Sequence, residues 1–235
     1  MRTGTSPDDK SVRNGFARKA PERVRAGTVR MSFPESGLYA ITQTANKSPD
    51  AVINEVAAAI KGGAVIVQYR DKNPLDALYL ARELVNICHQ HNVPLLINDD
   101  IELAALVGAD GVHLGREDGA VIQARKHLGR KAIIGVSCYD YVEKAIAAQA
   151  QGATYVAFGR FFPSSSKPLA APAHIETLYL AKRALTIPIV AIGGILPDNG
   201  GQLLAAGADL LAVIGGVFND QPEQSARAYQ ALFSR

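Results

Sequence analysis

The sequence predicts an α/β protein, a single (β/α)8 TIM barrel over residues 37–235 with a disordered basic N-terminal tail at residues 1–36. Short β-branched runs alternate with longer amphipathic stretches, the pattern of βα units that build a parallel sheet. Eight such units are present, which is the number that closes a barrel. A length of 235 residues, 48% of them hydrophobic, suits one domain with a sizeable core.

Each predicted strand is a short apolar run bounded by Gly, Pro, Asn, Asp or Ser. In chain order the strands are residues 38–42, 64–69, 94–98, 111–114, 132–137, 155–159, 187–192 and 210–214.

Each predicted helix is a segment between two strands, or after the last, with apolar residues at helical spacing. In chain order the helices are residues 49–61, 74–91, 101–107, 120–128, 142–150, 175–183, 199–206 and 222–233.

A weak internal repeat supports the barrel. Gly63, Gly108, Gly152 and Gly207 are each followed by Ala and lie between a helix end and an even-numbered strand. Each glycine suits a helix C-cap in the left-handed region. A doubly wound sheet is the rival fold, but it usually has a glycine fingerprint after its first strand, and residues 43–46 read QTAN.

The basic charge is concentrated in the tail. Residues 1–30 hold eight basic and three acidic side chains, a net +5, so a whole-chain charge of +3 leaves −2 for the remainder. We therefore expect no nucleic-acid partner. The tail has no apolar core of a secretory signal. Two alternatives stay open for it, an organellar transit peptide and an upstream read-through with Met31 as the start codon.

Membrane insertion and disulfide chemistry are not expected. No apolar run approaches the roughly 18 residues that a spanning helix needs. Cys88 and Cys138 lie 50 positions apart without a CxxC or Cys/His cluster. A reducing cytoplasm is therefore the predicted compartment.

Polar residues follow the strands, where barrel enzymes place their active sites. The pairs Gly193–Gly194 and Gly215–Gly216 follow strands seven and eight, where exposed backbone N–H groups commonly hold a phosphate. A phosphorylated ligand is expected, although the glycines could simply turn two tight loops.

Acidic residues follow strands three and four. Asp99 and Asp118 leave adjacent strands, so their carboxylates can converge on one Mg²⁺ whose other ligands are water and phosphate oxygens. Acids at loop starts are also common helix N-caps, and for Asp100, directly before Ile101, capping is the preferred interpretation.

Cations lie on the same rim. Arg70, Lys72 and Lys167 are expected to clamp a di- or triphosphate beside the metal, although isolated Lys and Arg side chains are usually solvated. His113, within strand four, is expected to be a hydrogen-bonded core histidine. Cys138 has no evident activating base, so thiolate catalysis is not expected.

Seven segments occur in a characteristic order: QYRDK (68–72), LINDD (96–100), GADGVHLGRED (108–118), IGVS (134–137), YVAFGRFFPSSSKP (155–168), VAIGGI (190–195) and AVIGG (212–216). Together they resemble the thiamine phosphate synthase family, barrel transferases that join the pyrimidine and thiazole halves of thiamine phosphate. The resemblance covers the chain from about Gly37 onward and makes the barrel a catalytic domain.

The resemblance also implies roles by position. Binding of hydroxymethylpyrimidine diphosphate falls to Gln68, Arg70, Lys72, Asn98 and Lys167, with Ser137 against the pyrimidine ring. Mg²⁺ falls to Asp99 and Asp118, and the thiazole phosphate to Ser164, Ser165, Ser166, Gly194, Ile214 and Gly215. The catalytic set is Arg70, Lys72, Ser137 and Lys167. In the family, diphosphate leaves first and the thiazole nitrogen captures the resulting carbocation.

Departures from the family pattern are local. Serines replace the two threonines of the loop after strand six, Gly215 stands where many members carry Ser, and Arg116 replaces a Gln. Two rival functions stay open, a metal-independent thiazole tautomerase and a non-catalytic sensor of thiamine precursors. The expected partners are small phosphorylated substrates, and a homo-oligomer is compatible with the sequence.

Overall fold

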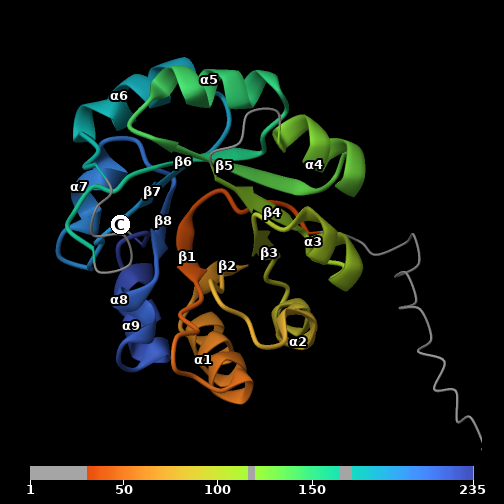
Figure 1. The fold of residues 1–235 in the computed structure, drawn as a ribbon. Coiled ribbons are helices and arrows are strands. Elements are labelled where there is room, and N and C mark those ends of the chain that lie inside the picture. Colours follow the sequence, from red (N-terminus) through yellow and green to blue (C-terminus); the bar gives the residue numbers. More distant parts are fainter. Residues whose placement is uncertain (1–30, 116–119, 165–170, 235) are drawn as a thin grey trace, which may run out of the picture.

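The computed structural model describes residues 31–115, 120–164 and 171–234. Eight parallel strands hydrogen-bond in chain order, and β1 also pairs with β8, so the sheet closes into a barrel. Figure 1 shows this ring of strands with the helices around its outside. The predicted (β/α)8 barrel is confirmed.

The strands agree with the predicted ones to within two residues at each end. They are β1 (Gly37–Ile41), β2 (Ala64–Tyr69), β3 (Leu95–Asn98), β4 (Gly111–Leu114), β5 (Ile133–Tyr139), β6 (Tyr155–Phe158), β7 (Ile189–Ile192) and β8 (Leu210–Val213).

Four of the predicted helices have the predicted bounds. The helices are α1 (Pro49–Lys61), α2 (Ala77–Gln90), α3 (Ile101–Val107), α4 (Ala120–Leu128), α5 (Val142–Ala150), α6 (Ile175–Ala184), α7 (Gly200–Ala205), α8 (Gly215–Phe218) and α9 (Pro222–Gln230). The sequence analysis did not predict α8, because four residues are too few for a helical period.

Side-chain capping explains where α1, α2 and α3 begin. The Ser48 side chain accepts from the Ala51 N–H at the start of α1, and Asp76 accepts from Tyr79 at the start of α2. The Asp100 side chain caps α3 by accepting a hydrogen bond from the Leu103 N–H at 2.8 Å, which confirms the predicted capping role.

The internal repeat has a structural basis. Gly108 is the left-handed C-cap of α3, and the other three repeat glycines also have positive φ. The side chains of Asp110, Thr154 and Asp209 then accept hydrogen bonds from backbone N–H groups on β3, β5 and β7. The repeat therefore ties β4, β6 and β8 each to the preceding odd strand.

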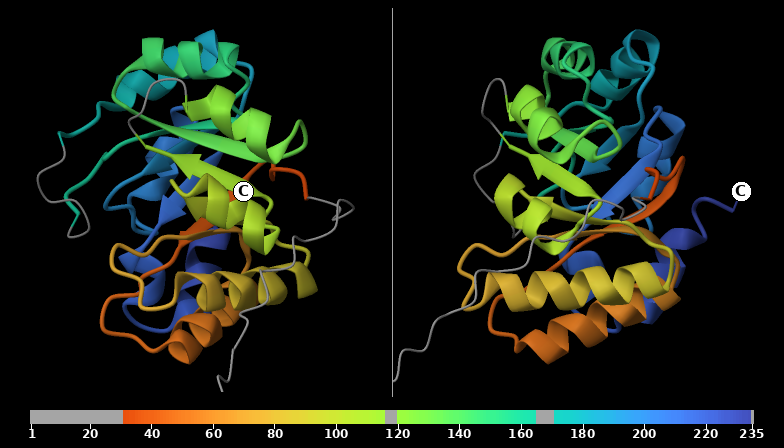
Figure 2. Two further views of the ribbon diagram at one scale, coloured as in Figure 1. Left: turned by 45° about the vertical axis from the view of Figure 1, so that its right-hand side comes forward. Right: turned by 90° about the vertical axis from the view of Figure 1, so that its right-hand side faces the viewer.

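The apolar core has two parts. Side chains inside the barrel include Ile66, Leu96 and Leu210, whereas a larger cluster fills the space between the strands and the helices. In the side views of Figure 2, α1 and α2 pack side by side on the outside of the barrel.

The segment before β1 contacts the barrel although residues 31–36 fall within the predicted tail. The Met31 N–H donates to the buried Asp110 carboxylate, and the Phe33 ring stacks on Tyr155 at 4.3 Å between centroids. The predictions for residues 1–30 lie outside the described residues.

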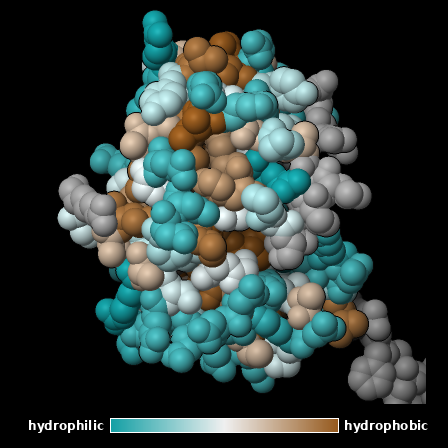
Figure 3. Space-filling model, turned by 90° about the vertical axis from the view of Figure 1, so that its left-hand side faces the viewer, coloured by the Kyte–Doolittle hydropathy of each residue, from teal (hydrophilic) through white to brown (hydrophobic). Residues whose placement is uncertain are grey.

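The outer surface is mixed. Figure 3 views the side that carries α6 and α7 and shows hydrophobic residues interspersed with hydrophilic ones. The large exposed hydrophobic residues include Tyr179 and Leu180 on α6. Within the described ranges, no helix is long and apolar enough to cross a membrane.

Candidate active site at the carboxyl ends of the strands

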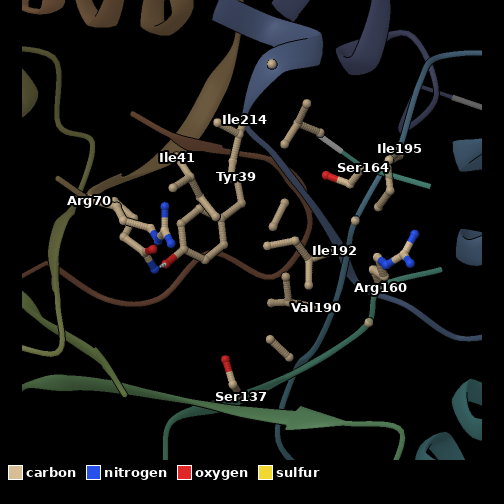
Figure 4. Close-up of a pocket in the computed structure, with 18 of the residues that line it drawn as sticks. Tyr39, Ile41, Arg70, Ser137, Arg160, Ser164, Val190, Ile192, Ile195 and Ile214 are labelled. Atoms are coloured by element: carbon tan, nitrogen blue, oxygen red, sulfur yellow. Dashed lines mark hydrogen bonds between the residues drawn. The ribbon is translucent and has the colours of Figure 1, made fainter. Parts of the chain in front are cut away.

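A cavity of about 350 Å³ opens where the strands end, which is the end of the barrel that the sequence indicated. Nine of the predicted site residues line it: Gln68, Arg70, Asn98, Asp99, Ser137, Ser164, Gly194, Ile214 and Gly215. Figure 4 shows Tyr39 and Arg70 on one side of this cavity, with Arg160, Ser164 and Ile195 on the opposite side. The cavity therefore has two polar sides separated by apolar side chains such as Val190 and Ile192.

The backbone of Arg70 is fixed at the edge of the cavity by two hydrogen bonds to Thr42. The Thr42 hydroxyl, buried at the end of β1, accepts from the Arg70 N–H at 2.9 Å and donates to the Arg70 carbonyl oxygen at 3.0 Å. This pair of bonds joins the ends of β1 and β2, so the guanidinium starts from a fixed backbone position.

Asn98 and Asp99 form a small acid–amide unit at the end of β3. Asp99 adopts φ of +61°, a left-handed conformation that Asp and Asn tolerate better than most residues. Its carboxylate accepts hydrogen bonds from the Asn98 amide at 2.7 Å and from the Gly115 N–H at 2.8 Å. Each carboxylate oxygen keeps a further lone pair for a ligand.

A β-bulge in β5 places Ser137 and Tyr139 together at the cavity. The register between β5 and β6 shifts between these two residues, and Tyr139 has φ of +57°. Both line the cavity while Cys138 between them is buried. Bulges commonly re-aim side chains next to active sites.

Neither cysteine is equipped for catalysis. Desolvation by burial raises the pKa of the Cys138 thiol to about 12 and also raises the pKa of Cys88 strongly. Both thiols therefore stay protonated near neutral pH. The expectation that Cys138 is not a nucleophile agrees with this environment.

Glycines shape the side of the cavity formed by β7 and β8. Gly194 has φ of +62°, and a β-carbon there would collide with the Pro163 carbonyl oxygen. At Gly193 a β-carbon would collide with the β-carbon of Arg160. The glycines thus let the chain after β6 pass directly over the end of β7, which brings Ser164 to the cavity.

Some predicted residues are not brought to the cavity. Lys72 is exposed and does not line it. Ser165, Ser166, Lys167 and Asp118 lie outside the described residues, so their predicted roles remain predictions.

Several lining residues were not selected from the sequence. Tyr39 lies in mid-strand on β1, Tyr139 follows a bulge, and Arg160 is the second residue beyond the end of β6. Arg160 sits within a motif that the sequence analysis quoted, and its position after a strand was a usable signal. Period-2 alternation along β1 would have marked Tyr39 and Ile41 as one face.

The sequence profile described as thiamine monophosphate synthase matches residues 38–217, which is more than half of the chain. The chain belongs to the thiamine monophosphate synthase family. Among relatives in this family, the thiamine-phosphate synthase of Nitrosococcus oceani is 50% identical over 84% of this chain and 92% of its own. That of Methylococcus capsulatus is 50% identical over 87% of this chain and 91% of its own.

A solved structure agrees with this family membership. The thiamine phosphate pyrophosphorylase from Pyrococcus furiosus is 31% identical, with a TM-score of 0.76 that covers 85% of this chain and 96% of the other. The part of the chain matched to the thiamine monophosphate synthase family includes every strand except the first residue of β1.

Proposed function

We propose that this chain condenses hydroxymethylpyrimidine diphosphate with thiazole phosphate, or its carboxylate, to give thiamine phosphate and diphosphate. One observation carries the proposal: in a chain of this family, Arg70, Asn98 and Asp99 share one cavity with Ser164 and two glycine loops. Such a cavity can seat two phosphorylated molecules with their reacting ends between the two polar sides.

The diphosphate belongs on the side of Arg70 and Asn98. A guanidinium binds phosphate oxygens bidentately, and its backbone is pinned by Thr42. Lys72, exposed on the same rim, and Lys167 are proposed to add positive charge when the substrate is bound. The pyrimidine ring then lies toward Gln68 and Ser137.

Mg²⁺ fits the oxygen donors of this side. Asp99 offers a carboxylate beside the Asn98 amide, and such hard oxygen ligands suit Mg²⁺. We propose that Asp99 and Asp118 hold the ion, which when bound would neutralise charge on the departing diphosphate.

The thiazole phosphate belongs on the opposite side. Ser164, Gly194, Ile214 and Gly215 line the cavity there, and glycines leave backbone N–H groups uncovered for phosphate oxygens. We propose that Ser165 and Ser166 extend this phosphate site.

The reaction breaks the bond between the pyrimidine methylene carbon and the diphosphate oxygen, and the electron pair leaves with diphosphate. The thiazole nitrogen then donates its lone pair to the methylene carbocation and forms the new C–N bond. No side-chain nucleophile is required, which is consistent with two protonated, buried cysteines. Arg70, Lys72 and Lys167 stabilise the departing charge, and Ser137 holds the ring.

The deciding experiment is diphosphate release by the purified protein, with each substrate alone, with both, and with chelator in place of Mg²⁺. Release that needs both substrates and Mg²⁺ is the expected result. Isomerisation of the thiazole carboxylate without release would instead indicate a tautomerase, and inactivity in both assays would indicate a sensor.

We also propose a cytoplasmic location, in keeping with the two free thiols.

A further inference from the structure

Five polar side chains from five strands form one continuous hydrogen-bonded chain across the barrel interior. The Gln68 amide nitrogen lies 2.8 Å from the Tyr39 hydroxyl, which lies 2.8 Å from the Tyr155 hydroxyl. The Tyr155 hydroxyl lies 2.8 Å from Nδ1 of His113, and Nε2 of His113 lies 2.9 Å from the Ser137 hydroxyl. We name this set the interior relay.

The two tyrosines of the interior relay are shielded from water and packed closely. Tyr39 and Tyr155 are buried, with exposures of 1% and 0%. Phe33 stacks under the Tyr155 ring, and Gly135 leaves the space that the Tyr155 ring occupies, since a β-carbon there would collide with it. Burial raises the pKa of both phenols, so each hydroxyl keeps its single proton.

The Gln68 amide donates to Tyr39, whereas the contact between Tyr39 and Tyr155 allows either hydroxyl to be the donor. We assign Tyr39 as the donor, because each hydroxyl has one proton and in this direction every bond of the interior relay has one donor and one acceptor. In the assigned direction Tyr155 donates to Nδ1 of His113, and the imidazole proton lies on Nε2. Nε2–H then donates to the Ser137 oxygen, and the Ser137 proton is left to point to another acceptor.

The two ends of the interior relay line the same cavity, and so do Tyr39 and His113, whereas Tyr155 does not. With its amide nitrogen committed to Tyr39, Gln68 offers its carbonyl oxygen as an acceptor, whereas Ser137 offers its hydroxyl as a donor. To exchange donor for acceptor at Gln68 or at Ser137, every hydrogen bond between the two residues would have to reverse its direction. The hydrogen-bonding characters of Gln68 and Ser137 are therefore coupled, although β2 and β5 lie three strands apart.

We propose that the interior relay fixes an acceptor at Gln68 and a donor at Ser137, and thereby selects an aminopyrimidine over an oxopyrimidine. An amino group donates to the Gln68 oxygen while a ring nitrogen accepts from Ser137. An oxo substituent presents an acceptor to the Gln68 oxygen and leaves it unpaired. Tyr39, Tyr155 and His113 are in this sense positioning residues, and the inference rests on the proposed pyrimidine substrate.

The first test compares two substrates. For each protein, kcat/KM is measured with the amino pyrimidine diphosphate and with its oxo analogue, each with thiazole phosphate. The wild type should prefer the amino substrate by on the order of 10²-fold or more. Tyr155→Phe breaks the interior relay at its centre and should reduce this preference at least about tenfold, with KM for thiazole phosphate unchanged.

The matched control is Tyr229→Phe, which removes the hydroxyl of another buried tyrosine, bonded to the Ile195 carbonyl outside the interior relay. It should keep the wild-type preference. An unchanged preference in Tyr155→Phe would overturn the proposal. Should Tyr155→Phe fail to fold, Tyr39→Phe removes the neighbouring hydroxyl of the interior relay. It should reduce the preference for the amino substrate to the same extent.

The second test needs no activity. Nitrogen-15 NMR of the ligand-free protein at about pH 8 reports the tautomer of each imidazole, with His113 assigned by the signal lost in His113→Gln. The expected form is Nε2–H, and any other protonation state of His113 overturns the assigned direction. If the protein releases no diphosphate with either pyrimidine, the proposed function is wrong. The tautomer of His113 still tests the direction of the interior relay in that case.

Discussion

The carboxylate of Asp99, at the end of β3, accepts a hydrogen bond from the N–H of Gly115, at the end of β4, across 2.8 Å. This bond joins the ends of two neighbouring strands at the cavity. It also holds the carboxylate that we propose as a Mg²⁺ ligand, whereas the next residue, Asp100, caps α3. Two adjacent acids thus have separable roles.

Asp99→Asn should reduce diphosphate release at least about 100-fold, because an amide loses the charge that holds Mg²⁺. The melting temperature should fall by no more than about 2–4 °C, since Asn tolerates the left-handed backbone of this position and only one of the two exposed hydrogen bonds loses its acceptor. Kinetics over a Mg²⁺ titration and thermal unfolding check both expectations. A folded Asp99→Asn variant with normal turnover would contradict the metal assignment.

Asp100→Ala should lower stability and leave turnover nearly unchanged, in contrast to the loss of turnover expected for Asp99→Asn. Loss of its bond to the Leu103 N–H should cost about 1 kcal/mol of unfolding free energy, which corresponds to about 2–4 °C in melting temperature. Its kcat should stay close to that of the wild type. A large loss of turnover here would show that Asp100, too, acts at the cavity.

Arg70→Gln should raise KM for the pyrimidine diphosphate by roughly 10- to 100-fold, the loss expected for a charged hydrogen bond of about 1.5–3 kcal/mol. KM for thiazole phosphate should change much less, because that substrate belongs on the opposite side of the cavity. Arg82→Gln on the exposed face of α2 is the control and should leave both values unchanged. Equal increases in both KM values would argue against two separate sides.

The pair formed by Asp140 and His174 should make stability depend on pH. Hydrogen bonding to Asp140 raises the pKa of His174 above 6.5. Desolvation raises the pKa of Asp140, but bonds from Thr177 and His174 outweigh it and hold the pKa below 3.8. The pair links the end of β5 to the start of α6.

The direction of the pH dependence follows from the two pKa shifts. The His174 contribution is fully present below its unfolded pKa and is lost as the pH rises through its raised folded pKa. The Asp140 contribution is present above its unfolded pKa and is lost as the pH falls through its lowered folded pKa. The difference in melting temperature between the wild type and His174→Gln should therefore be larger at about pH 5.5 than at about pH 8.5. A difference that is constant with pH would contradict the ion pair.

Cys88 and Cys138 should resist thiol reagents in the folded protein. Burial raises both pKa values, that of Cys138 to about 12, so little thiolate exists near neutral pH. Titration with a chromogenic disulfide should detect no fast-reacting thiol before denaturant is added and two thiols afterwards. Fast labelling of Cys138 without unfolding would indicate that the bulge of β5 opens.

The sequence by itself determined the eight strands, every described helix except α8, and the end of the barrel that carries the site. Apolar periods, glycine caps and Asp100 act within a few residues, so α1 and α3 have the predicted bounds. Parallel strands also carry their following residues to one end, which is why Arg70 and Asp99 could be selected without coordinates.

Only the tertiary structure decided which interior side chains meet. Tyr39 and Tyr155 are 116 positions apart, and their hydroxyls bond because closure and register of the barrel place them at one level. The bulge at Cys138 and the passage of Arg160 over Gly193 likewise depend on how neighbouring strands align. An alternating pattern gives the face of a residue but not its height in the barrel, so these contacts follow only once all eight strands have closed.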